Sequence, residues 1–493
     1  MTTQTVSSSL SAIRFDNSFA RLPAPFFRRV NPTGLKNPVL VSFNQELAEL
    51  LGLQVQTPEE QELLLQTMSG NALLPNSEPL AMKYTGHQFG YYNPDLGDGR
   101  GLLLGEIHDP QGSHWDLHLK GAGMTPFSRG GDGRAVLRSC IREYLCSEAM
   151  HGLGIPTTRA LCIIGSQEPV YRETVETGAT LLRVARTHIR FGHFEYFSYS
   201  RDQQNLKILA DYLISQQFPD WQDQPERYQL LLEEAVKRTA HLMAAWQAVG
   251  FNHGVMNTDN MSILGETFDY GPFAFLDDYQ SGYICNHSDY QGRYAFNQQP
   301  QIGLWNCQCL AQAMLPLVGE KAAMAALEQY EDHFHEHLMI LYRAKLGLEK
   351  QLEGDALLVR DLLREMERNQ VDYSIFFRQL GRFRSVQEPG GARDLFIDRA
   401  AFDGWAERYE RRLATELSTP AQRSEQMNRH NPKYILRNYM AQTAIEKAQQ
   451  GDFSEVNRLL HLLQKPFDEQ PENDHYAALP PDWGKGMEIS CSS

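Results

Sequence analysis

The sequence predicts an α+β fold in which a small α/β lobe precedes a large α-rich lobe. Between residues 80 and 180, alternating apolar residues separated by turn signals predict strands. After residue 200, apolar residues recur mainly at helical spacing. From these changes we divide the chain into an N-terminal extension (1–60), an N-lobe (61–180), a C-lobe (181–385) and a helical C-terminal region (386–493).

The individual elements follow from local patterns. Prolines between residues 23 and 38 favour extended or turning backbone in the extension. The expected elements are then, in order, a helix over 44–53, strands over 101–107 and 115–120, a glycine-rich loop over 121–134 and a helix over 135–152. Further helical patterns occupy 206–217, 228–249, 308–346 and 433–464.

The charge and cysteine content exclude several classes of protein. The formal net charge is −15, which disfavours general binding to nucleic acid or to an anionic membrane. No apolar run approaches the roughly 20 residues of a membrane span, and the N-terminus lacks the apolar core of a signal peptide. Seven cysteines in 493 residues are too few for a secreted disulfide scaffold. We therefore expect a cytoplasmic protein without nucleic-acid or membrane partners.

A lysine and a glutamate form the first candidate pair. Lys120 ends a predicted strand just before the glycine-rich loop, where it could reach a phosphate. Glu143 lies within the apolar arc of the next helix, where an unpaired carboxylate would be costly. Arg138 and Arg142 are expected on the opposite side of that helix. A strand lysine paired with a helix glutamate positions phosphates in kinases, although Glu148 also lies near the arc and stays an alternative partner.

Glycines and arginines predict an anion site nearby. The turn containing Gly97, Gly99 and Arg100 allows backbone N–H groups to approach an anion, as does the pair Asp132-Gly133. Each is weak alone, because an ordinary hairpin turn has the same composition. In an acidic chain, however, a polyphosphate ligand is favoured by the clustered arginines 129, 134, 138, 142, 183, 186 and 190.

The segment FNHGVMNTDNMSI (251–263) is similar to a kinase catalytic loop. His253 and Asn260 match the loop's histidine and metal-binding asparagine, but Val255 stands where kinases have the catalytic aspartate. Asp259 supplies an acid one residue before the asparagine, and Asp269 begins a DYG sequence that resembles the kinase DFG element. Their oxygen ligands suit Mg²⁺ or Mn²⁺. Val255 indicates either an inactive kinase fold or different chemistry with a relocated base.

Three other features are weaker candidates. The neighbouring acids Asp277 and Asp278 compete for the role of metal site. The histidines in DHFHEH (332–337) lack the HExxH order, so a packed or solvated helix face is the better interpretation. The cysteines in CQC (307–309) lack CxxC spacing and are interpreted as structural.

Together these motifs resemble the SelO or YdiU family of protein adenylyltransferases, the selenoprotein O family. The resemblance runs from about residue 15 to 493 and is concentrated in 83–100, 118–139, 183–197, 252–263, 269–277 and the CSS tail (491–493). It implies a protein-kinase-like, two-lobed fold with terminal extensions. It also implies that ATP binds in a flipped orientation, and that AMP is transferred to Ser, Thr or Tyr hydroxyls of protein substrates, in a redox stress response.

The resemblance also implies roles for individual residues. Asp259 would accept the proton, Asn260 and Asp269 would bind Mg²⁺ or Mn²⁺, and Glu143 would orient Lys120. The implied nucleotide contacts are Gly97, Gly99, Arg100, Lys120, Asp132, Gly133, Arg183 and Arg190.

A redox switch is a further expectation. Because the family carries a redox-active residue at the first position of its tail, we expect Cys285 and Cys491 to form a reversible disulfide that gates the cleft. The alternative is two separate thiols, one buried and one on a frayed tail.

Other functions stay open at this point. An ordinary kinase is disfavoured by Val255, and a nucleotide-binding pseudokinase scaffold is disfavoured by the intact Lys, Glu, Asn and Asp set. Uridylylation of proteins with UTP and Mn²⁺ would suit the same residues. The sequence does not distinguish Mg²⁺ from Mn²⁺ or ATP from UTP, and it does not identify the protein substrates or the oligomeric state.

Overall fold

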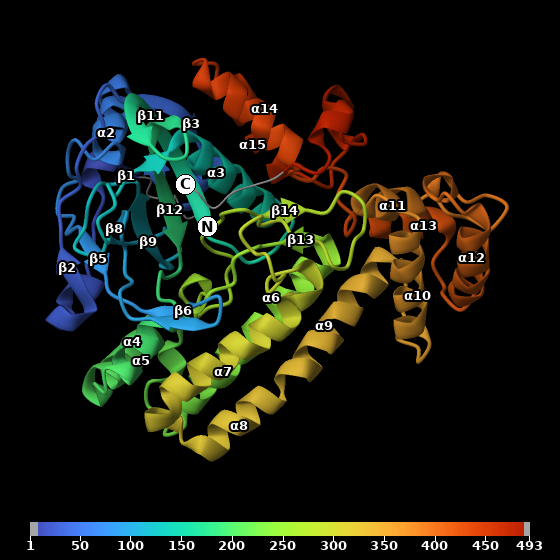
Figure 1. Cartoon of the computed structure of the whole chain (residues 1–493), viewed down its shortest axis with the longest axis horizontal. Coiled ribbons are helices and arrows are strands. Elements are labelled where there is room, and N and C mark those ends of the chain that lie inside the picture. The colour runs from blue at the N-terminus through green and yellow to red at the C-terminus, as the bar shows by residue number, and fades with distance from the viewer. Residues whose placement is uncertain (1–7, 488–493) are drawn as a thin grey trace, which may run out of the picture.

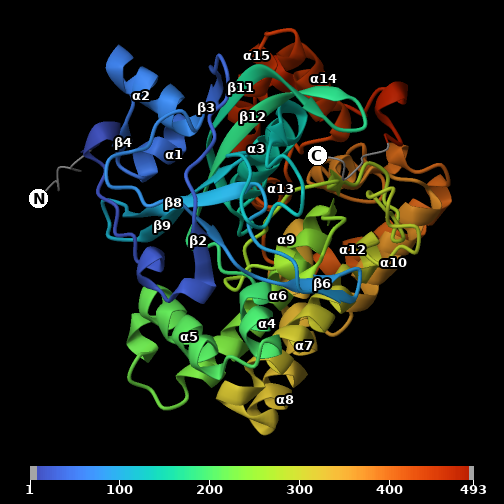
Figure 2. The ribbon, with the colours of Figure 1, turned by 60° about the vertical axis from the view of Figure 1, so that its left-hand side comes forward.

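A computed structural model describes residues 8–487 and contains one large antiparallel sheet. The eight strands of this sheet are β2 (Phe27–Arg29), β5 (Leu80–Met82), β8 (Gly101–His108), β9 (His114–Lys120), β12 (Val175–Ala185), β11 (Arg159–Tyr171) and β3 (Val39–Phe43) in spatial order, with β10 (Ala135–Val136) paired to β12. The first 60 residues, described above as an extension, thus supply two strands of the sheet. Figures 1 and 2 show the sheet beside a large group of helices.

Smaller elements surround the sheet. Three short ladders pair β1 (Ser8–Ser9) with β4 (Leu53–Gln54), β6 (Gly86–Gln88) with β7 (Tyr91–Asn93), and β13 (Phe251–Asn252) with β14 (Ala274–Phe275). Helix α1 (Gln45–Leu50) confirms the short helix expected here, and α2 (Pro58–Met68) follows it. Thr57 and Glu60 form a capping box that begins α2.

Helix α3 (Leu137–Gly152) is the central helix of this region. One side packs on β11 and β12, and the other side packs on α14 (Asn438–Gln449) and α15 (Ser454–Gln464), which return from the end of the chain. The Ser42 hydroxyl on β3 donates to Asn457 Oδ1 on α15 at 2.9 Å. Helix α3 is therefore buried on both sides.

This double burial corrects one prediction. Arg142, expected on the outer side of α3, is only 5% exposed. Its Nη2 donates to the Phe273 carbonyl at 2.9 Å, and its guanidinium lies 4.3 Å from the centre of the Phe273 ring. The prediction failed because it assumed one solvent face, whereas α14 and α15 cover that face.

The remaining helices form the second half of the molecule. They are α4 (Phe191–Tyr199), α5 (Gln203–Gln217), α6 (Arg227–Val249), α7 (Gln299–Val318), α8 (Glu320–Glu328), α9 (Tyr330–Lys345), α10 (Asp355–Arg368), α11 (Tyr373–Leu380), α12 (Arg399–Leu413) and α13 (Pro420–Asn428). Helix α6 packs against α7 and α9. Helices α10 to α13 surround a separate apolar cluster that includes Phe376, Trp405 and Tyr409.

Two long helical patterns are interrupted in the structure. The pattern over 308–346 is divided among α7, α8 and α9, because Gly319 adopts a φ of 75° between α7 and α8. The pattern over 433–464 is divided between α14 and α15 by a turn at Gly451. None of the helices between residues 8 and 487 combines the length and apolar character that crossing a membrane requires.

Candidate functional site

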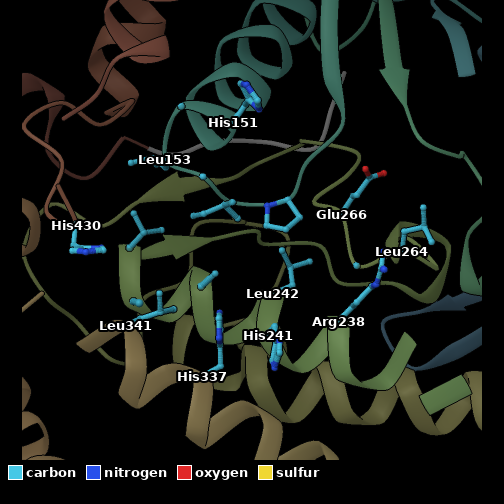
Figure 3. A pocket seen from close by; sticks show the side chains of 18 of the residues that line it. His151, Leu153, Arg238, His241, Leu242, Leu264, Glu266, His337, Leu341 and His430 are labelled. Atoms are coloured by element: carbon cyan, nitrogen blue, oxygen red, sulfur yellow. The ribbon is translucent and has the colours of Figure 1, made fainter. Parts of the chain in front are cut away.

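A cleft of about 490 Å³ brings the distant motifs of the sequence together. Its wall includes eleven of the predicted residues: Gly97, Gly99, Arg100, Lys120, Asp132, Gly133, Arg183, Arg190, Asp259, Asn260 and Asp269. A second and larger cavity (Figure 3) shares no lining residue with this cleft.

Lys120 and Glu143 form the expected pair behind the cleft. Lys120 ends β9 and is 5% exposed, and its Nζ donates to Glu143 Oε2 at 2.5 Å. Arg183 on β12 also donates to the Glu143 carboxylate, with Nη2 at 3.0 Å from Oε2. Burial alone would raise the pKa of Glu143, but the charges of Arg183 and Lys120 outweigh burial and lower it to about 2. The alternative acid, Glu148, instead binds Arg159 with two hydrogen bonds of 2.8 and 2.7 Å.

Arg183 extends this network to the DYG sequence. Its Nη2 lies 2.6 Å from Asp269 Oδ1, so the guanidinium bridges Glu143 and Asp269. Arg190 contacts the other oxygen of Asp269. Burial opposes ionisation, yet the two arginines hold the pKa of Asp269 well below its usual range. The cleft therefore contains an ionised chain that runs from Lys120 to Arg190.

Arg190 is fixed by more than charge. Its guanidinium lies between the rings of Tyr84 and Phe268, at 4.7 and 4.4 Å from their centres. Its Nη1 donates to the backbone carbonyl of Asp259 at 2.7 Å. The same arginine therefore positions both acids of the site, Asp259 and Asp269.

Asp259 has the properties of a proton acceptor. The side chain is 7% exposed, and its Oδ2 accepts from Gln88 Nε2 at 3.2 Å. No described residue donates to its Oδ1. Burial raises the pKa of Asp259 to about 7, against the opposing charge of Arg190. An acid with one buried oxygen that accepts no hydrogen bond, and with a pKa near neutrality, suits acid–base chemistry.

Asn260 and Asp269 fit a divalent cation. Asn260 Nδ2 donates to the Val255 carbonyl at 3.1 Å, and within the described chain no donor reaches its side-chain oxygen. That oxygen and the Asp269 carboxylate are hard donors of the kind that Mg²⁺ and Mn²⁺ prefer. Because Asp269 already contacts two arginines, a bound cation would share this carboxylate with them.

The glycine-rich loop forms part of the wall of the cleft. Gly133 has a φ of 69°, and a Cβ there would lie 2.0 Å from the Gly123 carbonyl oxygen, so the loop requires glycine. The carboxylate of its neighbour Asp132 binds Arg172 through two hydrogen bonds of 2.8 and 2.9 Å. A backbone N–H of the loop, that of Arg134, also donates to Asp132.

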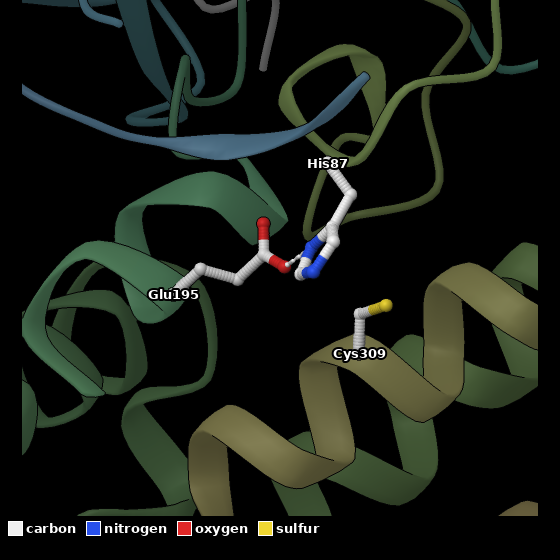
Figure 4. Close-up of side chains that lie close together, drawn as sticks. All are labelled: His87, Glu195 and Cys309. Atoms are coloured by element: carbon white, nitrogen blue, oxygen red, sulfur yellow. Dashed lines mark hydrogen bonds and ion pairs between the residues drawn. The ribbon is translucent and has the colours of Figure 1, made fainter. Parts of the chain in front are cut away.

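A polar cluster that the sequence did not predict supports the segment that contains Asp259 (Figure 4). His87 Nδ1 lies 2.5 Å from Glu195 Oε1, and the Thr258 hydroxyl donates to the other oxygen of Glu195. The backbone N–H of His87 donates to Thr258 Oγ1 at 2.7 Å, which fixes the residue next to Asp259. Cys309 on α7 completes a group whose possible ligand atoms lie within 4.8 Å of one another. No local periodicity links residues so far apart in the chain, so sequence reasoning missed them.

The weaker candidates lie elsewhere. Asp277 pairs with Arg437, and Asp278 lies 3.4 Å from Lys485, so neither acid lines the cleft. The histidines at 333 and 337 pack beside His241 on α6.

The arginines of α3 do not form the predicted anion site. Arg138 binds Glu176 through two hydrogen bonds, and Arg142 is buried against Phe273. Neither guanidinium group lies in the wall of the cleft, so that part of the prediction is wrong.

The predicted redox pair is described only in part. Cys285 is 5% exposed, and its Sγ donates to Asn252 Oδ1 at 2.8 Å. It also lies against Gly254, where an added Cβ would be 2.5 Å from the sulfur. Cys491 lies outside the described residues.

Comparisons with known proteins agree over almost the whole chain. The family model "Protein adenylyltransferase SelO" matches residues 9–464. A protein of Myxococcus xanthus strain DK1622, named "Protein nucleotidyltransferase YdiU", is 56% identical over 490 residues that cover 99% of this chain and 100% of that protein. A protein of the same name from Aliivibrio salmonicida strain LFI1238 is 56% identical over 483 residues, covering 98% and 99% respectively.

Proposed function

We propose an activity from one premise: the chain belongs to the SelO family of protein adenylyltransferases and is a nucleotidyltransferase. The proposed reaction is the transfer of AMP from ATP to Ser, Thr or Tyr hydroxyls of protein substrates, with Mg²⁺ or Mn²⁺. We place the protein in the cytoplasm and its activity in the response to redox stress. The proposed architecture is protein-kinase-like, with the sheet as one lobe, the helices as the other, and the cleft between them.

One observation carries this proposal: the buried ionised chain formed by Lys120, Glu143, Arg183, Asp269 and Arg190 along the cleft. Three cations held in fixed positions by two carboxylates form a preorganised site for a triphosphate. The partly unsatisfied carboxyl group of Asp259 lies beside them.

The proposed mechanism assigns a role to each residue. A protein hydroxyl attacks the α-phosphorus of ATP, and pyrophosphate leaves. Lys120, Arg183 and Arg190 offset the charge that builds on the leaving group. Asp259 accepts the hydroxyl proton, a contribution that is typically 10²–10⁴-fold. A divalent cation held by Asn260 and Asp269 would supply further charge neutralisation and orient the phosphates.

Isotope labelling distinguishes this reaction from the alternatives. The full-length protein is incubated with ATP labelled on either the α- or the γ-phosphate, and separately with UTP, in Mg²⁺ or Mn²⁺. We expect covalent transfer of the α label and a mass increase of one AMP. Transfer of the γ label would indicate a kinase, UMP incorporation would indicate uridylylation, and no transfer would indicate a scaffold.

The Cys285–Cys491 disulfide belongs to the same proposal. Its support is that Cys285 contacts Asn252 and Gly254, which border the catalytic segment. In the proposed reaction, the two thiols lose two protons and two electrons to oxidised glutathione, which becomes two reduced glutathiones. The test is mass spectrometry of unreduced peptides at several glutathione poises, together with activity. A failure to link under oxidising conditions, or equal activity in both states, would reject the switch.

A further inference from the structure

The larger cavity, of about 830 Å³, lies beside the C-terminal end of α3 and between α6, α9 and the segment that follows α13. In Figure 3, labelled side chains from above and below, such as His151 and Leu242, project around one common space. Its volume falls within the roughly 300–1,000 Å³ of small-molecule sites. It is therefore large enough for a ligand of its own.

The wall of this cavity is cationic, although the chain is acidic. It contains Arg186, Arg238, Lys345 and Arg429 together with four histidines, and Glu266 is the single acid among its described lining residues. Arg238 and Arg429 pair with acids at 2.7 and 2.5 Å. Arg186 and Lys345 have no such partner among the ion pairs of residues 8–487.

Lys345 is the most unusual of these cations. It ends α9, is only 5% exposed, and its Nζ lies 4.3 Å from the centre of the Phe377 ring and 5.5 Å from that of Tyr373. Burial lowers its pKa to about 7. Its titratable neighbours, Tyr373 of α11 and His430 and Arg429 after α13, add no negative charge. A buried ammonium without a carboxylate is costly, and an anion in the cavity would offset that cost.

The rest of the wall is mainly apolar. Leu242, Ala245 and Val249 of α6 face the cavity together with Leu264, Leu341 and Phe467. This combination suits a molecule with an apolar body and one anionic end.

The histidines do not indicate a metal ion. His241 and His337 are stacked with their ring centres 4.3 Å apart, and burial together with the neighbouring His337 and His333 lowers the pKa of His241 to about 4. Both groups of possible metal ligands in residues 8–487 lie outside this cavity.

The cavity shares two chain segments with the cleft. Arg186 lies between Arg183 and Arg190 in sequence, and Glu266 lies three residues before Asp269. The intervening Thr267 is tied to α6, because Trp246 Nε1 donates to its hydroxyl at 3.0 Å. A molecule in the cavity would therefore contact the segments that position the cations and acids of the cleft.

We propose that this cavity is a regulatory site for a small amphipathic carboxylate, which places its anionic end at Lys345 and its apolar body along α6, and whose binding changes the affinity of the cleft for ATP. This inference goes beyond the proposed function, because it needs only that the cleft binds ATP. Linkage requires that ATP and the carboxylate alter each other's affinity by the same factor.

Calorimetry with octanoate tests the site on the full-length protein. We expect saturable binding to one site, at least tenfold weaker binding of the uncharged analogue octanamide, and at least tenfold weaker octanoate binding to Lys345→Met. The matched control is Lys321→Met, which changes an exposed lysine on α8 and should bind as the wild type does. Ala245→Phe, which fills the cavity from α6, should also abolish binding, and thermal unfolding checks that each variant is folded.

The outcomes are decisive in both directions. Absence of saturable octanoate binding, equal binding of octanamide, or unchanged binding to both Lys345→Met and Ala245→Phe would overturn the site. We further expect saturating octanoate to change the ATP dissociation constant at least fivefold, and an unchanged constant would overturn the regulatory role. ATP binding without octanoate is measured separately, so failure of the cleft is distinguished from failure of the cavity.

Discussion

Replacement of Glu143 by glutamine removes one charge from the centre of the buried network and preserves its shape. Glu143 is 1% exposed, and its pKa falls from 4.5 to about 2 when the protein folds. At 1.36 kcal/mol per pKa unit, this shift corresponds to a contribution of about 3 kcal/mol. Because the folded pKa is depressed, the contribution is present above pH 4.5 and is lost as the pH falls towards 2. The cost of breaking a buried ion pair, about 3–5 kcal/mol, has the same magnitude.

Urea unfolding followed by tryptophan fluorescence at pH 7.5 measures this effect. We expect Glu143→Gln to lower the free energy of unfolding by about 3 kcal/mol and to weaken ATP binding, because Lys120 and Arg183 lose a shared carboxylate. Glu148→Gln is the matched control. It breaks another buried pair on α3, with Arg159, so it should lower stability but leave ATP affinity unchanged.

A second control defines the result that would refute this reasoning. Glu349→Gln changes an exposed side chain and should alter neither stability nor ATP binding. If Glu143→Gln were as stable as Glu349→Gln at pH 7.5, the carboxylate could not be the ionised centre of the network. If the loss of unfolding free energy in Glu143→Gln, relative to wild type, grew below pH 4.5, the sign of the pKa shift would be wrong.

Four further outcomes are expected. Asp259→Ala should abolish AMP transfer while ATP binding and the melting temperature stay near wild type, and wild-type turnover would remove Asp259 as the base. Lys120→Ala should weaken ATP binding and activity together and lower stability by roughly 1–3 kcal/mol; an unchanged melting temperature would show that Arg183 alone compensates Glu143. Gly86→Ala should reduce turnover, because the added Cβ would lie 2.8 Å from Asp259 Oδ1. ATP affinity is the control and should not change. Full turnover would contradict the close packing of Gly86 against Asp259. Lys345→Met should be more stable than wild type at pH 6.5, by up to about 5 kcal/mol, because the pKa of the lysine drops from 10.5 to about 7 on folding. Chemical denaturation should show that this difference in unfolding free energy vanishes as the pH approaches 10.5. A difference that stayed constant with pH would refute the lowered pKa.

The Lys120–Glu143 pair was predictable because both residues carry local signals. An acid in an apolar arc requires a cation, and a strand that ends before a glycine-rich loop supplies one. Local patterns could not show that Arg183 shares the same carboxylate. They also missed β11 and β12, because β12 ends in consecutive buried residues, including Thr180 and Arg183, and so lacks the alternation of apolar and polar residues.

The contacts and burial of a residue were predicted poorly where segments far away in the sequence determine them. Glu195 supports Thr258 through contacts between parts of the chain that have no common periodicity. Arg142 was placed at the surface because α14 and α15, which cover it, follow almost 300 residues later. The cationic cavity escaped prediction for the same reason, since its wall combines α3, α6, α9 and the chain after α13.

The return of α14 and α15 to the sheet also has a consequence for biosynthesis. The contact between Ser42 and Asn457 joins residues 415 positions apart. At a translation rate of about 5–20 residues per second, roughly 20–80 seconds separate the synthesis of β3 from that of α15, which packs on it. Until α14 and α15 emerge, the face of α3 that packs on them lacks these partners, so the sheet and its helix can complete their packing only near the end of synthesis. A ribosome that stalls before α14 would therefore hold a chain whose apolar α3 face is available to chaperones.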